Sequence, residues 1–141
     1  MIYQTAELLE EIRNLLTLFG ASAPVHLVGN VPHETLDWWY SSADFILSGS
    51  HYEGSGIAIS EAMSCGCIPI VTNIASFRKM TGDTGLLYTP GDDNALFHCL
   101  EHSLEIDIPL TRQNVLHLFE KELSFDAIAH KINRIIAPIH L

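Results

Sequence analysis

Positive charge is scarce in this 141-residue chain, which has 7 lysine and arginine residues against 17 aspartate and glutamate residues and a formal net charge of -10. Nucleic acids and anionic membrane surfaces are bound mainly through clusters of basic side chains, so this balance disfavours both as partners. The same deficit is unfavourable for a ligand that carries phosphate groups.

Cysteine is also rare, since the chain has only Cys65, Cys67 and Cys99 and no C-x-x-C pair. An odd, small number of cysteines disfavours a disulfide framework and predicts a reducing, cytoplasmic environment. The first residues are acidic and lack a basic run before an apolar core, which disfavours a signal peptide. No apolar stretch is long enough to span a bilayer, so we expect no transmembrane segment.

The residues that are present are typical of a folded domain. Hydrophobic residues make up 48% of the chain and charged residues 17%, with 9 glycines and 6 prolines. The length allows one domain of ordinary size. We find no internal repeat, low-complexity tract or linker, and therefore expect residues 1–141 to form one unit.

Helical and strand patterns alternate along the chain. Helices are expected at residues 5–19, 32–40, 57–64, 92–104, 110–123 and 124–136, and strands at Val25–Val28, 44–47, 68–72 and 84–88. Gly20 and Gly66 are expected to end helices, and Asp92 or Asp93 and then Ser124 to cap them. The strands are short and almost continuously apolar, which is typical of a parallel sheet covered on both faces. The sequence therefore predicts an α/β fold with about four strands.

A glycine-rich loop leads from the second of these strands into a helix that begins near Ile57. Gly54 and Gly56 leave the backbone open to a ligand and permit positive φ. The N–H groups of Ile57 and Ala58 would be free at the helix start, where they attract an anion. Ligands of open parallel sheets bind at the carboxyl ends of the strands, which is where this loop is expected.

Two acidic residues accompany the loop, Glu53 before the helix and Glu61 on its second turn. The carboxylate of Glu61 could accept hydrogen bonds from two vicinal hydroxyls, such as those of a ribose. The separation of the two acids disfavours the close pair of a hydrolase. Glycine loops and solvated helical acids also occur in α/β folds without a site there, so the residues alone leave both interpretations open.

The run from Glu53 to Val71, EGSGIAISEAMSCGCIPIV, resembles the E-x7-E signature of retaining glycosyltransferases with the GT-B fold, especially those of family 4. Flanking segments resemble further motifs of that family in the same order, namely VGNV at 28–31, YSSAD at 40–44, GLLYTPGD at 85–92 and LSF at 123–125. The resemblance implies a Rossmann-like three-layer α/β/α domain, half of a GT-B architecture. It also implies transfer of a glycosyl group from a nucleotide-diphosphate sugar with retention of anomeric configuration, without a metal or other cofactor.

The resemblance also implies roles for individual residues. Glu53 would be the catalytic residue that binds sugar hydroxyls near the reacting carbon, and Glu61 would bind the ribose. The other implied contacts are with the sugar and phosphates for Gly54, Ser55 and Gly56, with the pyrophosphate for the N–H groups of Ile57 and Ala58, and with the base for the backbone of Val31 and Pro32.

The chain departs from the family pattern at several positions. The family usually has proline where Gly49 stands, an aromatic or aliphatic residue in place of Ser55, and Gly-Gly with a later glutamate where this chain has Ala75-Ser76 and Lys79. The family's arginine and lysine that clamp the diphosphate lie in a first βα unit, for which the chain has no counterpart. Arg78 and Lys79 are the nearest basic candidates, but a solvated turn is expected there.

We therefore expect residues 1–141 to be a partial donor-binding domain that lacks the acceptor-binding domain and the first two βα units. Such a fragment should be inactive alone. Its missing strands would leave a gap in the sheet, and we expect two copies to associate through the incomplete edge as a homodimer. Peripheral attachment to a membrane is left open for the parent enzyme.

The sequence also bears on three other functions. A nicotinamide-dependent dehydrogenase is disfavoured because Ile59 stands where a third glycine would be needed. His98 and His102 form an H-x3-H pair on one helix, but no third metal ligand is evident. The remaining alternative is a degenerate, non-catalytic glycosyltransferase-like module that binds a nucleotide or a protein partner.

Overall fold

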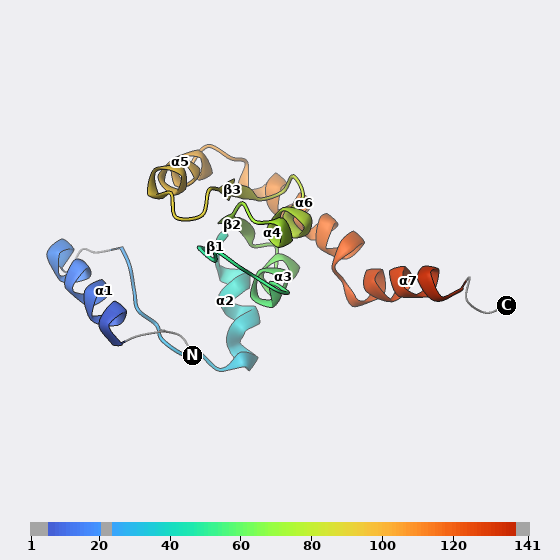
Figure 1. Ribbon diagram of the computed structural model, residues 1–141, viewed down its shortest axis with the longest axis horizontal. Helices are drawn as coiled ribbons and strands as arrows, with labels where there is room; N and C mark the ends of the chain where they lie inside the picture. Colours follow the sequence, from blue (N-terminus) through green and yellow to red (C-terminus); the bar gives the residue numbers. More distant parts are fainter. Residues whose placement is uncertain (1–5, 21–23, 138–141) are drawn as a thin grey trace. The chain divides into compact units, whose positions relative to one another are not determined.

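The computed structural model describes residues 6–20 and 24–137, which form two compact units, one up to Leu36 and the other from Asp37 (Figure 1). Each unit is described by itself. The boundary between the units falls between Leu36 and Asp37.

The first unit holds helix α1 (Ala6–Phe19) and the short 3-10 helix η2 (His33–Thr35). Gly20 follows α1 with a φ of 70°, as expected of a residue that ends a helix. The strand predicted at Val25–Val28 is wrong, because residues 25–32 have no regular structure and the side chains of Val25 and Val28 are about half exposed. A strand needs a neighbour to satisfy its backbone groups, and none of the described residues pairs with this segment.

The second unit is an α/β domain with a three-stranded parallel sheet in the order β1-β2-β3. Its elements are α2 (Leu36–Ser42), β1 (Phe45–Ser48), α3 (Ile57–Ser64), β2 (Ile68–Thr72), α4 (Ala75–Thr81), β3 (Leu86–Tyr88), α5 (Asp93–Ser103), α6 (Ile108–Glu122) and α7 (Phe125–Ile136). The parallel α/β class is confirmed. The described residues form three strands rather than about four, because 25–28 is not a strand.

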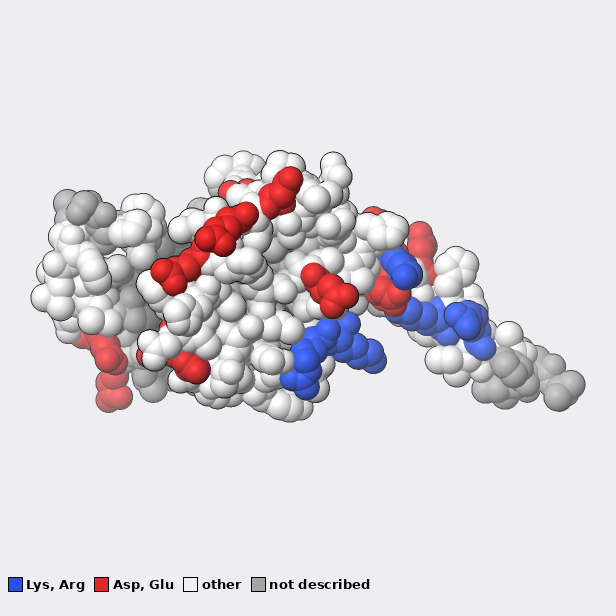
Figure 2. All heavy atoms as spheres, turned by 90° about the horizontal axis from the view of Figure 1, so that it is seen from above, with Lys and Arg blue, Asp and Glu red and all other residues white. Residues whose placement is uncertain are grey.

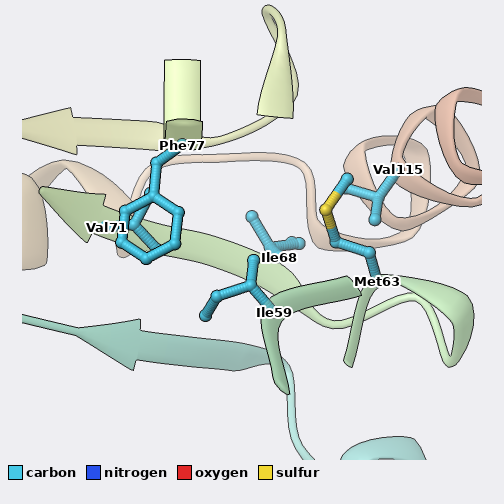
Figure 3. Close-up of a cluster of buried hydrophobic side chains, with 6 residues drawn as sticks. All are labelled: Ile59, Met63, Ile68, Val71, Phe77 and Val115. Atoms are coloured by element: carbon cyan, nitrogen blue, oxygen red, sulfur yellow. The ribbon is translucent and has the colours of Figure 1, made fainter. Parts of the chain in front are cut away.

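Strand β2 is the centre of the core. All five of its residues are buried, which explains its unbroken apolar sequence. Figure 3 shows the cluster that packs around it, formed by Ile59, Met63, Ile68, Val71, Phe77 and Val115. Helices α3, α4 and α6 supply the side chains that do not come from β2. This packing places the start of α3 beside the carboxyl end of the sheet.

Two predicted helix caps are confirmed, since the side chains of Asp92 and Ser124 accept hydrogen bonds from Ala95 N and Ala127 N at 2.9 and 3.1 Å. Helix α4 was not predicted. It is short and buries only Phe77 and Thr81, one turn apart, so its sequence carries little helical periodicity.

Candidate functional site

The glycine-rich loop, residues 49–56, follows β1 at the carboxyl edge of the parallel sheet. Side chains from the other two strands hold its beginning. The Tyr88 hydroxyl, from β3, donates to the carbonyl of Ser48 at 3.0 Å, and the Thr72 hydroxyl, from β2, donates to the carbonyl of Ser50. The loop is therefore fixed across the strand ends, which is the position that the sequence predicted for a ligand site.

Glu53 lies within this loop and bonds to the start of α3. Its Oε1 accepts hydrogen bonds from Ser55 N at 3.2 Å and Gly56 N at 3.1 Å. The N–H of Gly56 first, and then that of Ser55, stabilise the carboxylate and lower the pKa of Glu53 below its usual value. Glu53 is thus ionised at neutral pH, and its carboxylate shapes the loop.

The two loop glycines differ in their surroundings. Gly56 precedes α3 with a φ of 61°, and a Cβ built there would lie 2.6 Å from Met80 Cε and 3.4 Å from the Phe77 ring. Gly54 has no positive φ, and nothing lies within 4 Å of its Cβ position. Gly56 is therefore required by the close approach of α3 to α4 as well as by its φ, whereas Gly54 has open space beside it.

The first turn of α3 presents free hydrogen-bond donors. The N–H groups of Ile57 and Ala58 have no hydrogen-bond partner within residues 6–20 and 24–137, and both residues are exposed. Such donors, together with the helix dipole, favour a negatively charged group. The structure thus leaves free the two backbone N–H groups that the sequence predicted to be free at the helix start. Their role in binding an anion stays a prediction.

Glu61 is half-buried on α3, and its carboxylate has no hydrogen bond or ion pair within the described part of the chain. It lines a pocket of about 510 Å³ together with Ser55, Ile57, Ser60, Ser64, Met80, Phe119, Leu123, Phe125 and Ile128. The pKa of the Tyr40 hydroxyl is raised by burial and, to a lesser extent, by the negative charge of Glu61. Glu61 is therefore free to accept hydrogen bonds from a ligand.

The structure brings Ser55, Ile57 and Glu61 together around this pocket, while Glu53 and Gly54 lie on the loop outside its lining. Val31 and Pro32, which the resemblance assigned to the base, belong to the first unit. Pro32 is extended, with a φ of -60°, and precedes η2.

Figure 2 shows acidic side chains scattered over one face, while the basic side chains gather in two groups. Arg78 and Lys79 lie on helix α4, so the expected solvated turn is wrong. The Arg78 guanidinium donates to the backbone O and the Oδ1 of Asn73, at 2.8 and 2.7 Å, and is already engaged.

Sequence reasoning did not single out Arg112 of α6, which joins three elements of the second unit. It donates to the carbonyls of Ala43 at 2.8 Å and Cys65 at 3.2 Å, and approaches Asp44 Oδ1 at 3.4 Å. These bonds tie the end of α3 to the start of β1. No local pattern could reveal them, because the partners are 47 to 69 positions away in the sequence.

The other candidate groups occupy ordinary surroundings. His98 and His102 lie 3.2 and 3.8 Å from carboxylates of Glu101 and Glu105, and the described ranges hold no cluster of three or more residues that could bind a metal. All three cysteines are free thiols. In the same ranges, no helix combines the length and apolar character needed to cross a membrane.

The chain is similar in sequence and in fold to known proteins. A family model described as "Glycosyl transferases group 1" matches residues 6–114. The chain is 37% identical over 83 residues to O-antigen chain mannosyltransferase B of Escherichia coli, covering 59% of this chain and 22% of that protein. It is 33% identical over 75 residues to a GDP-mannose:cellobiosyl-diphosphopolyprenol alpha-mannosyltransferase of Xanthomonas oryzae pv. oryzae (strain PXO99A), covering 53% of this chain and 20% of that protein.

Among solved structures, sucrose-phosphate synthase from Thermosynechococcus elongatus superposes with a TM-score of 0.74 at 27% sequence identity, covering 92% of this chain and 34% of that protein. The chain spans only about a fifth of the length of the curated relatives described above. The similarity therefore concerns one part of larger enzymes.

Proposed function

The chain belongs to the glycosyl transferases group 1 family, and on that premise we propose that it forms the donor-binding part of a retaining glycosyltransferase of family 4 that uses a nucleotide-diphosphate sugar. The acceptor would bind to another domain of the full-length enzyme. We infer a cytoplasmic location for this enzyme, with any membrane association being peripheral.

One observation carries the proposal, namely the geometry between the end of β1 and the second turn of α3. There the Glu53 carboxylate is bonded to the amides of Ser55 and Gly56, and the N–H groups of Ile57 and Ala58 are left without a partner. Donors of this kind suit a diphosphate, while an unpaired carboxylate at Glu61, one turn further, suits vicinal hydroxyls.

In this proposal Glu53 binds the donor sugar, Glu61 binds the ribose, and the backbone from Gly54 to Ala58 lies along the sugar and diphosphate. Ile57 and Ala58 donate their N–H groups to phosphate oxygens. Basic side chains of the full-length enzyme would neutralise the rest of the diphosphate charge, because Arg78 is engaged with Asn73.

GDP-mannose is the first donor to test. Both curated relatives are named as mannosyltransferases, and the name of one specifies GDP-mannose as its donor. The part of each relative that the chain matches is short, so other nucleotide-diphosphate sugars belong in the same screen.

The ribose assignment is tested by titrating GDP and GDP-mannose calorimetrically against the full-length protein and its Glu61→Ala variant. Losing a hydrogen-bonded charged partner costs about 1.5–3 kcal/mol, so affinity for both ligands should fall about 10- to 100-fold. Glu120→Ala, which removes an exposed acid from α6, is the matched control and should leave both affinities unchanged. Unchanged affinity of Glu61→Ala for bare GDP would remove the assignment.

Glu53→Gln separates a catalytic role from a structural one. It should reduce turnover strongly while leaving the dissociation constant of GDP nearly unchanged, because the proposal places Glu53 at the sugar. Equal losses in both would mean that Glu53 only shapes the loop. Nucleotide binding without transfer by the unaltered full-length protein would favour the non-catalytic alternative.

A further inference from the structure

We propose that Tyr88 is a positioning residue. Its hydroxyl, together with that of Thr72, holds the loop carrying Glu53 in its ligand-binding orientation. The importance for catalysis rests on the proposed function, whereas the positioning itself does not.

The hydroxyl reaches across the whole sheet. Tyr88 is at the end of β3 and is paired with Thr72 of β2, while its bond partner, Ser48, is at the end of β1. Neighbouring strands lie about 4.8 Å apart, so β3 and β1 are separated by about 10 Å. The Tyr88 side chain spans this gap to reach Ser48, and phenylalanine would fill the same space without a donor.

The bond is made by a buried group. Tyr88 is only 6% exposed, and burial followed by the influence of Cys99 raises the pKa of its hydroxyl. The hydroxyl therefore stays protonated at physiological pH and acts as a neutral donor. Its hydrogen bond to the Ser48 carbonyl, 3.0 Å long, satisfies a group that would otherwise be costly to bury.

The two carbonyls that accept hydrogen bonds from Tyr88 and Thr72 flank a glycine. Tyr88 bonds to Ser48 and Thr72 bonds to Ser50, with Gly49 between them. Glycine is the residue with the greatest backbone freedom, so without the two hydrogen bonds the backbone would be most flexible at this point. The Cβ position of Gly49 lies 3.5 Å from the Tyr88 hydroxyl, which shows that the hydroxyl packs directly against this residue.

The hydrogen bonds from Tyr88 and Thr72 affect Glu53 because only a few residues separate it from the carbonyls that accept them. Ser50 is three residues before Glu53, and the Glu53 carboxylate bonds forward to the amides of Ser55 and Gly56. The segment between Ser50 and Gly56 is thus held at both ends. Releasing the first end should weaken the bonds at the second, although Tyr88 does not touch Glu53 itself.

The experiment compares solvent exchange of the Ser55 and Gly56 amides in the unaltered chain and in Tyr88→Phe by NMR. Losing one net hydrogen bond should raise exchange at both amides about three- to tenfold. Tyr52→Phe makes the same chemical change on an 87% exposed tyrosine of the same loop and should have no effect. The Val71 amide in the core strand is the internal reference for global stability.

Equal increases at Val71 and Gly56 would show a merely structural role and overturn the proposal, as would unchanged exchange at Gly56. Thr72→Val, which removes the donor to Ser50 while keeping the shape of the side chain, should reproduce the local effect and serves if Tyr88→Phe does not fold. These measurements need no ligand, so they remain valid if GDP-mannose does not bind. If it does bind, Tyr88→Phe should weaken GDP-mannose more than GDP.

Discussion

Replacing Gly56 by alanine tests whether this glycine is needed for packing. The added Cβ would lie 2.6 Å from Met80 Cε and 3.3 Å from Met80 Sδ, well inside van der Waals contact, and the residue would keep a φ of 61°. The left-handed conformation costs an L-residue about 1–2 kcal/mol. Overpacking costs about 1–3 kcal/mol, and the flexible end of a methionine favours the lower figure.

Together these effects predict that Gly56→Ala lowers the free energy of unfolding by about 2–4 kcal/mol. That is a large share of the roughly 5–15 kcal/mol that stabilises a typical domain. Urea denaturation followed by far-ultraviolet circular dichroism measures it. Gly54→Ala is the matched control, because nothing lies within 4 Å of its Cβ position and its φ is not positive.

Gly54→Ala should change stability by less than about 1 kcal/mol, with stabilisation the expected sign because alanine restricts the unfolded chain. A double-mutant cycle with Met80→Ala then isolates the clash, and a coupling of about 1 kcal/mol or more is expected. Equal, small effects of the two glycine substitutions would refute the packing argument and leave ligand approach as the reason for both glycines.

Four further predictions follow from the same structure. The lowered pKa of Glu53 means that the folded state favours its ionised form, so its stabilising contribution is present above the unfolded-state pKa and is lost as pH falls through the folded-state pKa. Glu53→Gln should therefore flatten the acid side of a urea-midpoint profile measured between about pH 6 and about pH 3, and parallel profiles would contradict this. Arg112→Ala should lower the free energy of unfolding by about 2–3 kcal/mol because it leaves two carbonyls without their charged donor, whereas Asp44→Asn, at a 59% exposed side chain, should cost less than about 0.5 kcal/mol in the same urea assay. Asp92→Ala should cost about 1 kcal/mol through loss of the α5 cap, and an unchanged thermal midpoint would argue against that cap. Light scattering on the purified chain should show a dimer formed through the sheet edge at β1, and a folded monomer at micromolar concentration would refute it.

Local signals were sufficient for most of the second unit. The boundaries of α3 and β2 were predicted to the residue, since glycines delimit the helix and an unbroken apolar run marks a fully buried strand. The caps at Asp92 and Ser124 were equally readable, because an N-cap bonds to an amide only three residues away.

Predictions failed where an element depends on distant partners. Residues 25–28 have the composition of a strand, but a strand forms only against a neighbour, and no strand of the described residues pairs with them. Helix α4 was missed for a related reason, because it is held by the burial of Phe77 and Thr81 rather than by a long apolar stripe.

The sequence by itself determined the parallel α/β class, the family, and the short region that holds the glycine loop and both glutamates, because each depends on residues close together in the chain. Only the tertiary structure decided how that region is held. The Met80 side chain lies where a Cβ at position 56 would clash with it, so glycine is needed there. The Tyr88 hydroxyl bonds to the backbone before the loop of Glu53, and Arg112 joins the end of α3 to the start of β1. These contacts join residues 24 to 69 positions apart, so their geometry arises only when the helices and strands pack together.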